Sequence, residues 1–270
     1  FFFMIAAYFS KKNFNSTLSI TGLGYLFSNR LNTKLIKFFL KPIFVWLINK
    51  TFKNIIYQNS SDENLFNKYS KFTNNSHLIE SSGLQGNQYL LKEKFNKQLK
   101  ILLAGRLLED KGIKKYVNLA SQMNSDNFKF YLAGELDEGN PKSLTQRDLE
   151  DIKNNKFVEY LGYLDLKKEL QEYDVLISLS DHEGFSRILL EAVYVGLYCI
   201  AYKNSGTEFI ENFQNTRTVD SKDLELINDE ITNVLNTEKN VSLNNREIII
   251  KKYSTKNIAN SFNEIYKLDI

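Results

Sequence analysis

The stretch 181–192 reads Asp-His-Glu-Gly-Phe-Ser-Arg-Ile-Leu-Leu-Glu-Ala. It follows the apolar, β-branched run 174–179, which is typical of a buried parallel strand, and from Ser186 its apolar residues recur at helical spacing. The pattern predicts that a strand ends, the chain turns at Gly184 and a helix begins with Ser186 as its N-cap. Unpaired backbone N–H groups and the positive end of the helix dipole then lie above the strand end, which predicts an anion-binding site.

Two glutamates bracket the start of this predicted helix. Glu183 precedes the helix, and Glu191 lies roughly 7 Å further along the helix axis at a rise of ~1.5 Å per residue. The pair can therefore reach the two ends of an extended ligand. For these residues taken alone an alternative stays open, namely an acidic helix N-terminus followed by a second acid on a solvated face.

From Leu99 onward, strand and helix patterns alternate along the chain with short loops between them. Such alternation predicts a parallel sheet with helices on both faces, whose ligands bind at the carboxyl ends of the strands. The predicted strands are 99–104, 128–133, 157–160, 174–179 and 198–202. The predicted helices are 113–123, 144–154, 166–172, 186–195 and 207–212, followed by two closing helices near 221–236 and 242–268.

The first hundred residues are less regular. Strands are predicted at 18–20, 54–58 and 78–79, with a helix at 62–69. The polar stretch 85–98 is rich in Lys, Asn and Gln, which is the composition of a linker. The expected organisation is a partial first lobe over residues 1–84, a linker over 85–98 and a second domain over 99–270.

Charge is distributed unevenly along the chain. Residues 1–100 hold 14 Lys and Arg against 4 Asp and Glu, whereas residues 101–270 hold 21 against 28. A basic half can face anionic lipid or a pyrophosphate-bearing acceptor, and its basic residues are dispersed among apolar ones, which ranks the membrane surface first and nucleic acid last. The single cysteine, Cys199, has no second cysteine for a disulfide or a metal cluster, which suits a reducing cytoplasm.

Three further segments of the first half have patterns of their own. The apolar run 1–9 is too short to span a bilayer and lacks the basic leader of a signal peptide, so we interpret it as a core helix interrupted by the start of the sequence. The segment Lys34–Lys50 is apolar with lysines at intervals, which fits a helix on a membrane surface and equally a helix packed on its own sheet. Gly22 and Gly24 form either a plain turn or a ligand loop.

The spacing of Glu183 and Glu191, with seven residues between them and Ala192 after them, resembles the paired-glutamate motif of the family 4 retaining glycosyltransferases. The resemblance extends over residues 15–268. LAGRL at 103–107 with DKG at 110–112 resembles the loop that holds the donor diphosphate, and LAG at 132–134, YLG at 160–162, DV at 174–175 and SGTE at 205–208 fall at further characteristic points. TGLG at 21–24 resembles the capsule-type and undecaprenyl-linked sugar transferases of this family.

This resemblance implies an α/β fold of two Rossmann-like lobes, the GT-B architecture, in which the last helix crosses back to the first lobe. The second lobe is expected to be a complete parallel sheet with helices on both faces that binds a nucleotide sugar. Relatives have a full α/β domain before the linker. The first, acceptor-side lobe is therefore expected to be incomplete, and a separately encoded amino-terminal segment is a candidate partner.

The resemblance also assigns roles to single residues. Glu183 is expected as the catalytic residue that grips the transferred sugar, and Glu191 as the acceptor of hydrogen bonds from the donor ribose. Arg106 and Lys111 offer a planar fork and a point charge to the diphosphate, although basic loop residues are also often simply solvated. The other expected donor-binding residues are Gly105, Gly162, Gly184, Phe185, Ser186 and Arg187, and His182 is a further candidate contact to the sugar.

The expected reaction is transfer, with retention, of a hexose or N-acetylhexosamine from a UDP-sugar to a lipid-linked or polysaccharide acceptor in bacterial surface glycan synthesis. It is expected in the cytoplasm, peripherally on the inner face of the membrane. No Asp-x-Asp lies in a suitable loop, so neither a metal nor a cofactor is expected beside the substrate. Two alternatives remain: a non-catalytic donor-binding subunit or remnant that needs a partner chain, and a UDP-sugar 2-epimerase, which the loop at 105–112 disfavours.

Overall fold

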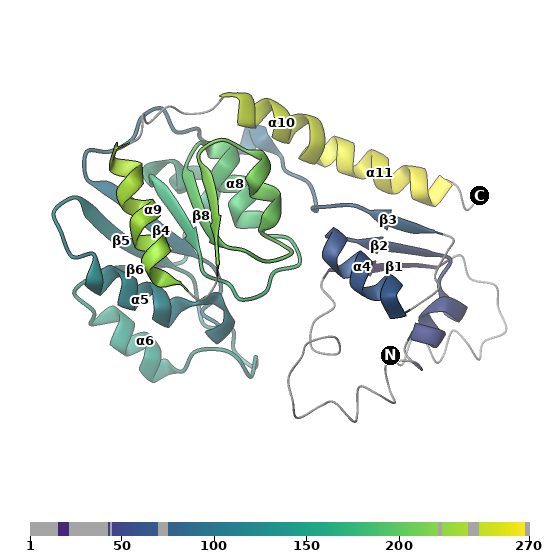
Figure 1. The fold of residues 1–270 in the computed structure, drawn as a ribbon, viewed down its shortest axis with the longest axis horizontal. Coiled ribbons are helices and arrows are strands. Elements are labelled where there is room, and N and C mark those ends of the chain that lie inside the picture. Colours follow the sequence, from purple (N-terminus) through teal and green to yellow (C-terminus); the bar gives the residue numbers. More distant parts are fainter. Residues whose placement is uncertain are drawn as a thin grey trace. The chain divides into compact units, whose positions relative to one another are not determined.

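The computed structural model describes residues 16–21, 43, 45–69, 75–220, 223–236 and 243–267. The chain divides into two compact units (Figure 1): a first unit of Phe1–Gly83 with Lys256–Ile270, and a second unit of Leu84–Thr255. The predicted apolar run 1–9, the glycines at 22 and 24 and residues 34–42 of the basic apolar segment lie outside the described residues. No helix in the described part of the chain is long and apolar enough to cross a membrane.

The second unit is built on a six-stranded parallel sheet with the order β6-β5-β4-β7-β8-β9. Its strand order reverses between β4 and β7, and in open α/β sheets the ligand crevice lies at the carboxyl ends of the strands at such a reversal. The strands are β4 (Leu99–Ala104), β5 (Phe128–Ala133), β6 (Val158–Gly162), β7 (Val175–Ser178), β8 (Tyr198–Tyr202) and β9 (Thr216–Val219).

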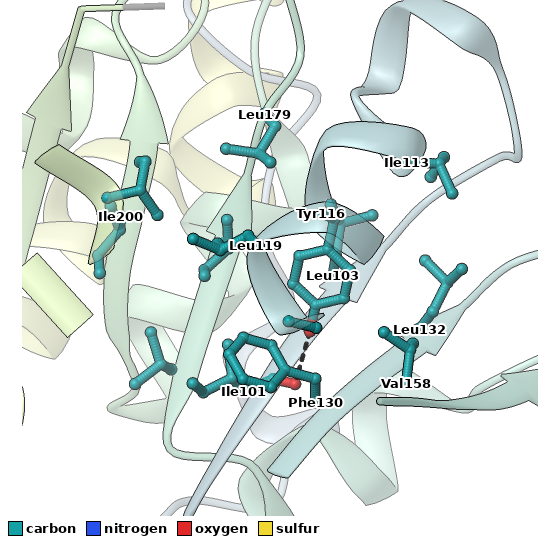
Figure 2. Close-up of a cluster of buried hydrophobic side chains, with 14 of the residues drawn as sticks. Ile101, Leu103, Ile113, Tyr116, Leu119, Phe130, Leu132, Val158, Leu179 and Ile200 are labelled. Atoms are coloured by element: carbon teal, nitrogen blue, oxygen red, sulfur yellow. Dashed lines mark hydrogen bonds between the residues drawn. The ribbon is translucent and has the colours of Figure 1, made fainter. Parts of the chain in front are cut away.

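Helices cover both faces of this sheet because successive strand residues point to opposite sides. One face packs against α5 (Ile113–Gln122), α6 (Gln146–Lys153) and α9 (Leu224–Asn236). Figure 2 shows this side, with Tyr116 of α5 among Ile101, Leu103 and Phe130, and with the Tyr116 hydroxyl donating to the Ile101 carbonyl at 2.8 Å. The other face packs against α8 (Arg187–Val195), α10 (Leu243–Tyr253), α7 (Leu166–Glu169) and the 3₁₀ turn after α7, Leu170–Glu172.

The first unit has a three-stranded parallel sheet with the order β1-β2-β3. One side of β2 packs against α4 and the helical residues 45–51, and the other side packs against α11 through Ile56, Ile79, Ile258 and Ile265. The elements are β1 (Thr17–Ile20), β2 (Asn54–Tyr57), α4 (Ser60–Tyr69), β3 (Ser76–Leu78) and α11 (Thr255–Lys267), which belongs to this unit from Lys256 on.

The predicted α/β class is confirmed, and three local differences have physical causes. The predicted helix 207–212 is a 3₁₀ turn, Glu208–Asn212. Strand β9 was not predicted, because its polar sequence Thr-Arg-Thr-Val is typical of an exposed edge strand and lacks the apolar pattern of a buried one. The predicted helix 242–268 is divided into α10 and α11. The division occurs because the chain at Ser254 forms a β-bridge with Leu84, in which the Leu84 N–H donates to the Tyr253 carbonyl at 2.8 Å.

The stretch 85–98, predicted as a linker, lies within the second unit and is anchored there by a buried ion pair. The Lys92 ammonium lies 2.9 Å from Oδ1 of Asp174, and the two side chains are 2% and 0% exposed. The Asp174 carboxylate also accepts the backbone N–H and side-chain amide of Asn96 and the backbone N–H of Lys100, at 2.8–2.9 Å. The start of β7 is thereby tied to the segment that precedes β4.

Replacing Asp174 by Ala should lower the free energy of unfolding by roughly 3–5 kcal/mol, because a buried ammonium would lose its counter-charge and three N–H groups would lose a charged acceptor. Denaturant unfolding followed by circular dichroism measures this change. The matched control is Glu159→Ala, which breaks the exposed Lys129–Glu159 pair at 2.9 Å and should cost less than about 1 kcal/mol. Equal losses for the two variants would contradict an anchoring role for Asp174.

Candidate functional site

A cavity of about 590 Å³ opens in the second unit at the carboxyl ends of β4, β5 and β7. This is the place at which the strand order reverses, so the topology and the cavity agree on the position of the site. The predicted site residues that line it are Gly105, Arg106, Lys111, Glu183, Phe185, Ser186 and Arg187. Tyr163, expected near the base as a neighbour of Gly162, also lines it, and lining residues that were not predicted include Glu135, Leu136, Asp137, Ser178 and Ser180.

Gly105 and Gly134 line the cavity at the point where the loops after β4 and β5 come into contact. Gly134 has φ +145°, and a Cβ atom at this position would lie 1.8 Å from the Gly105 carbonyl oxygen. The Gly105 N–H donates to the Ala133 carbonyl at 3.0 Å, and the Gly134 N–H donates to the Gly162 carbonyl at 2.7 Å. Three successive strand ends are thus joined by backbone hydrogen bonds, and only glycine fits at the point of contact.

Beyond these glycines, the loops after β4 and β5 are joined by further backbone and side-chain contacts. Leu108 and Ser143 form an antiparallel bridge, and the Leu107 N–H donates to the Glu135 carbonyl at 3.0 Å. Lys142 of the second loop forms an ion pair with Asp110 of the first at 2.5 Å. The loop with Arg106 and Lys111 is therefore supported by the neighbouring loop over most of its length.

Arg106 is paired with a carboxylate that the sequence did not indicate. Its Nη1 lies 2.6 Å from Oδ2 of Asp137, and the same oxygen accepts the Asn140 side-chain amide at 2.9 Å. The Asn140 amide and the Arg106 guanidinium lower the pKa of the Asp137 carboxyl group. Asp137 could have been suspected from its place in the loop after the predicted strand 128–133, although position alone does not show which cation it meets.

Lys111 is paired with Glu183, the glutamate at the mouth of the cavity. Its ammonium lies 2.5 Å from Oε1 of Glu183, and the two side chains are about one-fifth exposed. Gly112, at φ +74°, follows Lys111, and a Cβ there would lie 2.6 Å from the Leu179 carbonyl oxygen. This close approach brings the Lys111 loop against the end of β7, which is why residues more than seventy positions apart meet.

The start of α8 differs from the prediction in one respect. Ser186 occupies the N-cap position, but its side chain makes no capping hydrogen bond. The Ser186 Oγ is buried, and the structure gives it no hydrogen-bond partner among the described residues. The prediction of a serine-capped helix is therefore wrong in its chemistry. The cavity instead contains a free hydroxyl beside a helix N-terminus whose first N–H groups have no partner within the helix.

The loop before α8 is held by the stretch after β8. The Ser186 N–H donates to the Gly206 carbonyl at 2.9 Å, and the Ser205 hydroxyl lies 3.3 Å from the Glu183 carbonyl oxygen. A Cβ at Gly206 would lie 2.5 Å from that same oxygen. Phe185 lines the cavity and stacks on Phe209 at 4.4 Å between ring centroids, so both sides of Gly184 are fixed.

The remaining predicted residues lie around the cavity and are not part of its lining. Glu191 is 5% exposed on α8, and its Oε1 accepts the Arg187 Nε–H at 2.8 Å. Gly162, at φ +68°, precedes Tyr163, which lines the cavity and is 75% exposed. His182 is exposed to solvent beside Glu183. Among the described residues, no group of three or more His, Cys, Asp or Glu side chains is arranged to hold a metal ion.

Comparison with protein families identifies the second unit. A family described as Glycosyl transferases group 1 matches residues 91–260, which include every residue that lines the cavity. The chain belongs to the group 1 glycosyl transferases. The predicted family 4 motif thus lies inside the matched part of this group 1 glycosyltransferase. A search of curated proteins finds no significant sequence match.

Solved structures resemble this glycosyltransferase over nearly the whole chain at low sequence identity. Sucrose-phosphate synthase from Thermosynechococcus elongatus is 17% identical with a TM-score of 0.78, and the match covers 96% of this chain and 68% of that one. Anabaena HepE in complex with UDP and glucose is 17% identical with a TM-score of 0.73, covering 98% and 74%. TarM is 18% identical with a TM-score of 0.72, covering 95% of this chain and 51% of TarM. At such identities the likeness concerns the fold.

Replacing Gly134 by Ala should destabilise the second unit because the new methyl group meets a backbone oxygen that cannot move aside. Gly139→Ala is the matched control, since Gly139 also has a positive φ, +84°, but a Cβ there meets nothing within 4 Å. The clash should make Gly134→Ala less stable than Gly139→Ala by roughly 1–3 kcal/mol in denaturant unfolding. Equal stability of the two variants would show that the loops after β4 and β5 are not held in contact.

Proposed function

We propose that this group 1 glycosyltransferase is a family 4 type, retaining enzyme that moves a hexose or N-acetylhexosamine from a UDP-sugar to a lipid-linked or polysaccharide acceptor in bacterial surface glycan synthesis, such as that of a capsule. The observation that carries the proposal is the cavity at the reversal of the sheet, where the N-terminus of α8 meets two ion pairs, Arg106 with Asp137 and Lys111 with Glu183. HepE, a structural neighbour, is described in complex with UDP and with UDP-glucose, which supports a UDP-sugar as the donor.

In this proposal the donor diphosphate takes over the cations that carboxylates hold in the free protein. Arg106 is paired with Asp137 and Lys111 with Glu183, and both pairs are partly exposed, so their net contribution to stability is small. A diphosphate carries more negative charge than one carboxylate and offers a planar guanidinium a bidentate contact. The Ser186 hydroxyl and the first N–H groups of α8 add uncharged donors, so no metal ion and no cofactor is needed.

The two glutamates are assigned to different ends of the donor. Glu183 lies in the cavity and is proposed to hold the transferred sugar, with the backbone of Gly184 and Phe185 close by. Glu191 lies further along α8 and is proposed to accept hydrogen bonds from the ribose hydroxyls. Gly162 and Tyr163 are proposed to lie near the base. The exposed His182 has less support as a sugar contact, because it does not line the cavity.

The proposed chemistry requires no nucleophile from the protein. The bond between the sugar and the diphosphate breaks as the acceptor hydroxyl approaches on the same face, and the departing phosphate oxygen takes the proton of that hydroxyl. Negative charge therefore grows on the diphosphate as the bond breaks. Arg106, Lys111 and the start of α8 would stabilise this charge, and such preorganised donors act more strongly on the transition state than on the substrate.

The glutamate assignment predicts opposite results for two variants in calorimetric titration with UDP. Glu191→Ala should weaken UDP binding by roughly 1.5–3 kcal/mol, because a charge-assisted hydrogen bond to the ribose is lost. Glu183→Ala should leave UDP affinity unchanged or improve it, because Lys111 is released from its 2.5 Å ion pair, while turnover of a UDP-sugar falls.

Circular dichroism must first show that both variants fold. Loss of UDP binding in Glu183→Ala, together with normal binding in Glu191→Ala, would reverse the proposed orientation of the donor. Each titration is run with and without EDTA. Binding by the wild-type protein that disappears in EDTA would contradict the metal-free proposal.

We further propose that the protein works at the cytoplasmic face of the membrane as a peripheral protein, where lipid-linked acceptors are found. The support is the basic character of residues 1–100 and the exposure of Ile43 and Trp46, at 50% and 46%, on a helical segment. Basic segments with exposed aromatic and aliphatic side chains bind anionic membrane surfaces.

The membrane proposal predicts flotation of the protein with vesicles that contain phosphatidylglycerol, and release at high salt. Trp46→Ser should reduce the floated fraction severalfold. Leu226→Ser, which removes a 42% exposed leucine of α9 in the second unit, is the matched control and should have no effect. Equal flotation of the two variants, or flotation with purely zwitterionic vesicles, would contradict the proposal.

A further inference from the structure

Asp137 holds Arg106, yet it is not among the groups proposed to hold the donor. It lines the cavity on the loop after β5, and its Oδ2 lies 2.6 Å from Nη1 of Arg106 on the loop after β4. The ion pair therefore joins two loops across the cavity lining. A phosphate that binds the Arg106 guanidinium has to take it from this carboxylate.

The position of Asp137 is fixed by hydrogen bonds within its own loop. Its N–H donates to the Ser143 hydroxyl at 3.0 Å, and its carbonyl accepts the Asn140 N–H at 3.0 Å. Its Oδ2 accepts the Asn140 side-chain amide at 2.9 Å, and the Asn140 Oδ1 in turn accepts the Lys142 N–H at 3.1 Å. The carboxylate is thus held in place by contacts that do not involve Arg106.

Arg106 is the movable partner of this pair. Its side chain is 64% exposed, against 29% for the side chain of Asp137. The contact with Asp137 is the one ion pair that the described part of the chain provides for its guanidinium. Because an exposed pair contributes little to stability, the guanidinium can turn from Asp137 to a ligand at small cost.

The negative charge of Asp137 stays in the cavity when Arg106 turns away. The hydrogen bond from the Asn140 amide, more than the Arg106 guanidinium, lowers the pKa of the Asp137 carboxyl group. The carboxylate is therefore ionised at neutral pH with or without its cation. It then attracts the guanidinium back and repels a bound phosphate, and both effects oppose the ligand.

We propose that Asp137 competes with the nucleotide diphosphate for Arg106, which weakens the binding of UDP and speeds its release. This inference rests on the proposed function, because it takes Arg106 as a contact to the donor diphosphate. During binding, the guanidinium turns from a fixed carboxylate to the phosphate oxygens. During release, Asp137 takes the guanidinium back, so the diphosphate loses a bidentate contact. Asp137 contacts no substrate and acts through Arg106.

Titration with UDP tests this competition. Asp137→Asn keeps an acceptor oxygen for Asn140 and removes the charge, so UDP should bind roughly threefold to fivefold more tightly in calorimetry. Dissociation of UDP, measured by surface plasmon resonance, should slow by a similar factor. A variant with a merely damaged loop would bind UDP less tightly. Weaker binding by Asp137→Asn would therefore overturn the inference.

Glu138→Gln is the matched control. Glu138 follows Asp137 in the same loop, is exposed and does not line the cavity, and no ion pair is recorded for it within the described residues. This variant loses the same charge one residue away, and its UDP affinity should stay within about 1.5-fold of the wild type. Equal tightening in both variants would show that the net charge of the loop sets the affinity, which would overturn the inference.

A double-mutant cycle tests whether the effect passes through Arg106. In the Arg106→Gln background, Asp137→Asn should change UDP affinity by less than about 1.5-fold, because the competitor has lost the group for which it competes. Tightening that persists in this background would overturn the inference and leave the proposed function intact. Absence of UDP binding by the wild-type protein would instead overturn the proposed function itself.

A second measurement needs no variant and applies if Asp137→Asn does not fold. A crystal structure of the wild-type protein with UDP should show the Arg106 guanidinium on phosphate oxygens and beyond hydrogen-bonding distance from Asp137. Asp137 should keep its contact with Asn140 in that complex. A complex in which UDP is bound while Arg106 remains paired with Asp137 would overturn the inference.

Discussion

The contact between Gly134 and Gly105 is the constraint on which the rest of the site depends. A side chain at Gly134 would collide with the Gly105 carbonyl oxygen, so the two loops can approach only because the side chain is absent. This approach permits the antiparallel pairing of the loops and the Lys142–Asp110 ion pair. The loop that contains Arg106 and Lys111 owes its position to that pairing, because it contains only one short 3₁₀ turn, Glu109–Lys111.

Charge in the cavity is balanced within the chain itself. Each proposed phosphate-binding cation is paired with a carboxylate at 2.5–2.6 Å, and each of these carboxylates comes from a different loop. Partly exposed pairs contribute little to stability and can be exchanged at small cost. A cavity with two unpaired cations would attract any anion, whereas paired cations favour a ligand that carries more than one negative charge. If the cavity binds a diphosphate as proposed, Asp137 and Glu183 would contribute to its selectivity as well as to its structure.

Glu183 and Glu191 have different environments, which fit the different tasks proposed for them. Glu183 lies on a loop held by Gly206 and pairs with a flexible lysine, which suits a group whose contacts change during a reaction. Glu191 is buried on a helix and accepts the Arg187 Nε–H at 2.8 Å, which suits a contact that stays the same from binding to release. Burial of a carboxylate is costly unless hydrogen bonds compensate, so the hydrogen bond from Arg187 to Glu191 also supports the fold.

The sequence by itself determined the α/β class, most strands of the second unit within one or two residues and the loops that form the cavity, because apolar periodicity and strand-end glycines are local signals. It also indicated Arg106, Lys111 and Glu183, which lie where such loops follow strands. Only the tertiary structure decided their partners. The pairing of Arg106 with Asp137, the pairing of Lys111 with Glu183 and the division of the last helix at Ser254 depend on residues far apart in the chain. A local sequence pattern does not specify which distant side chain will contact a given residue. That contact is decided by the packing of the folded chain.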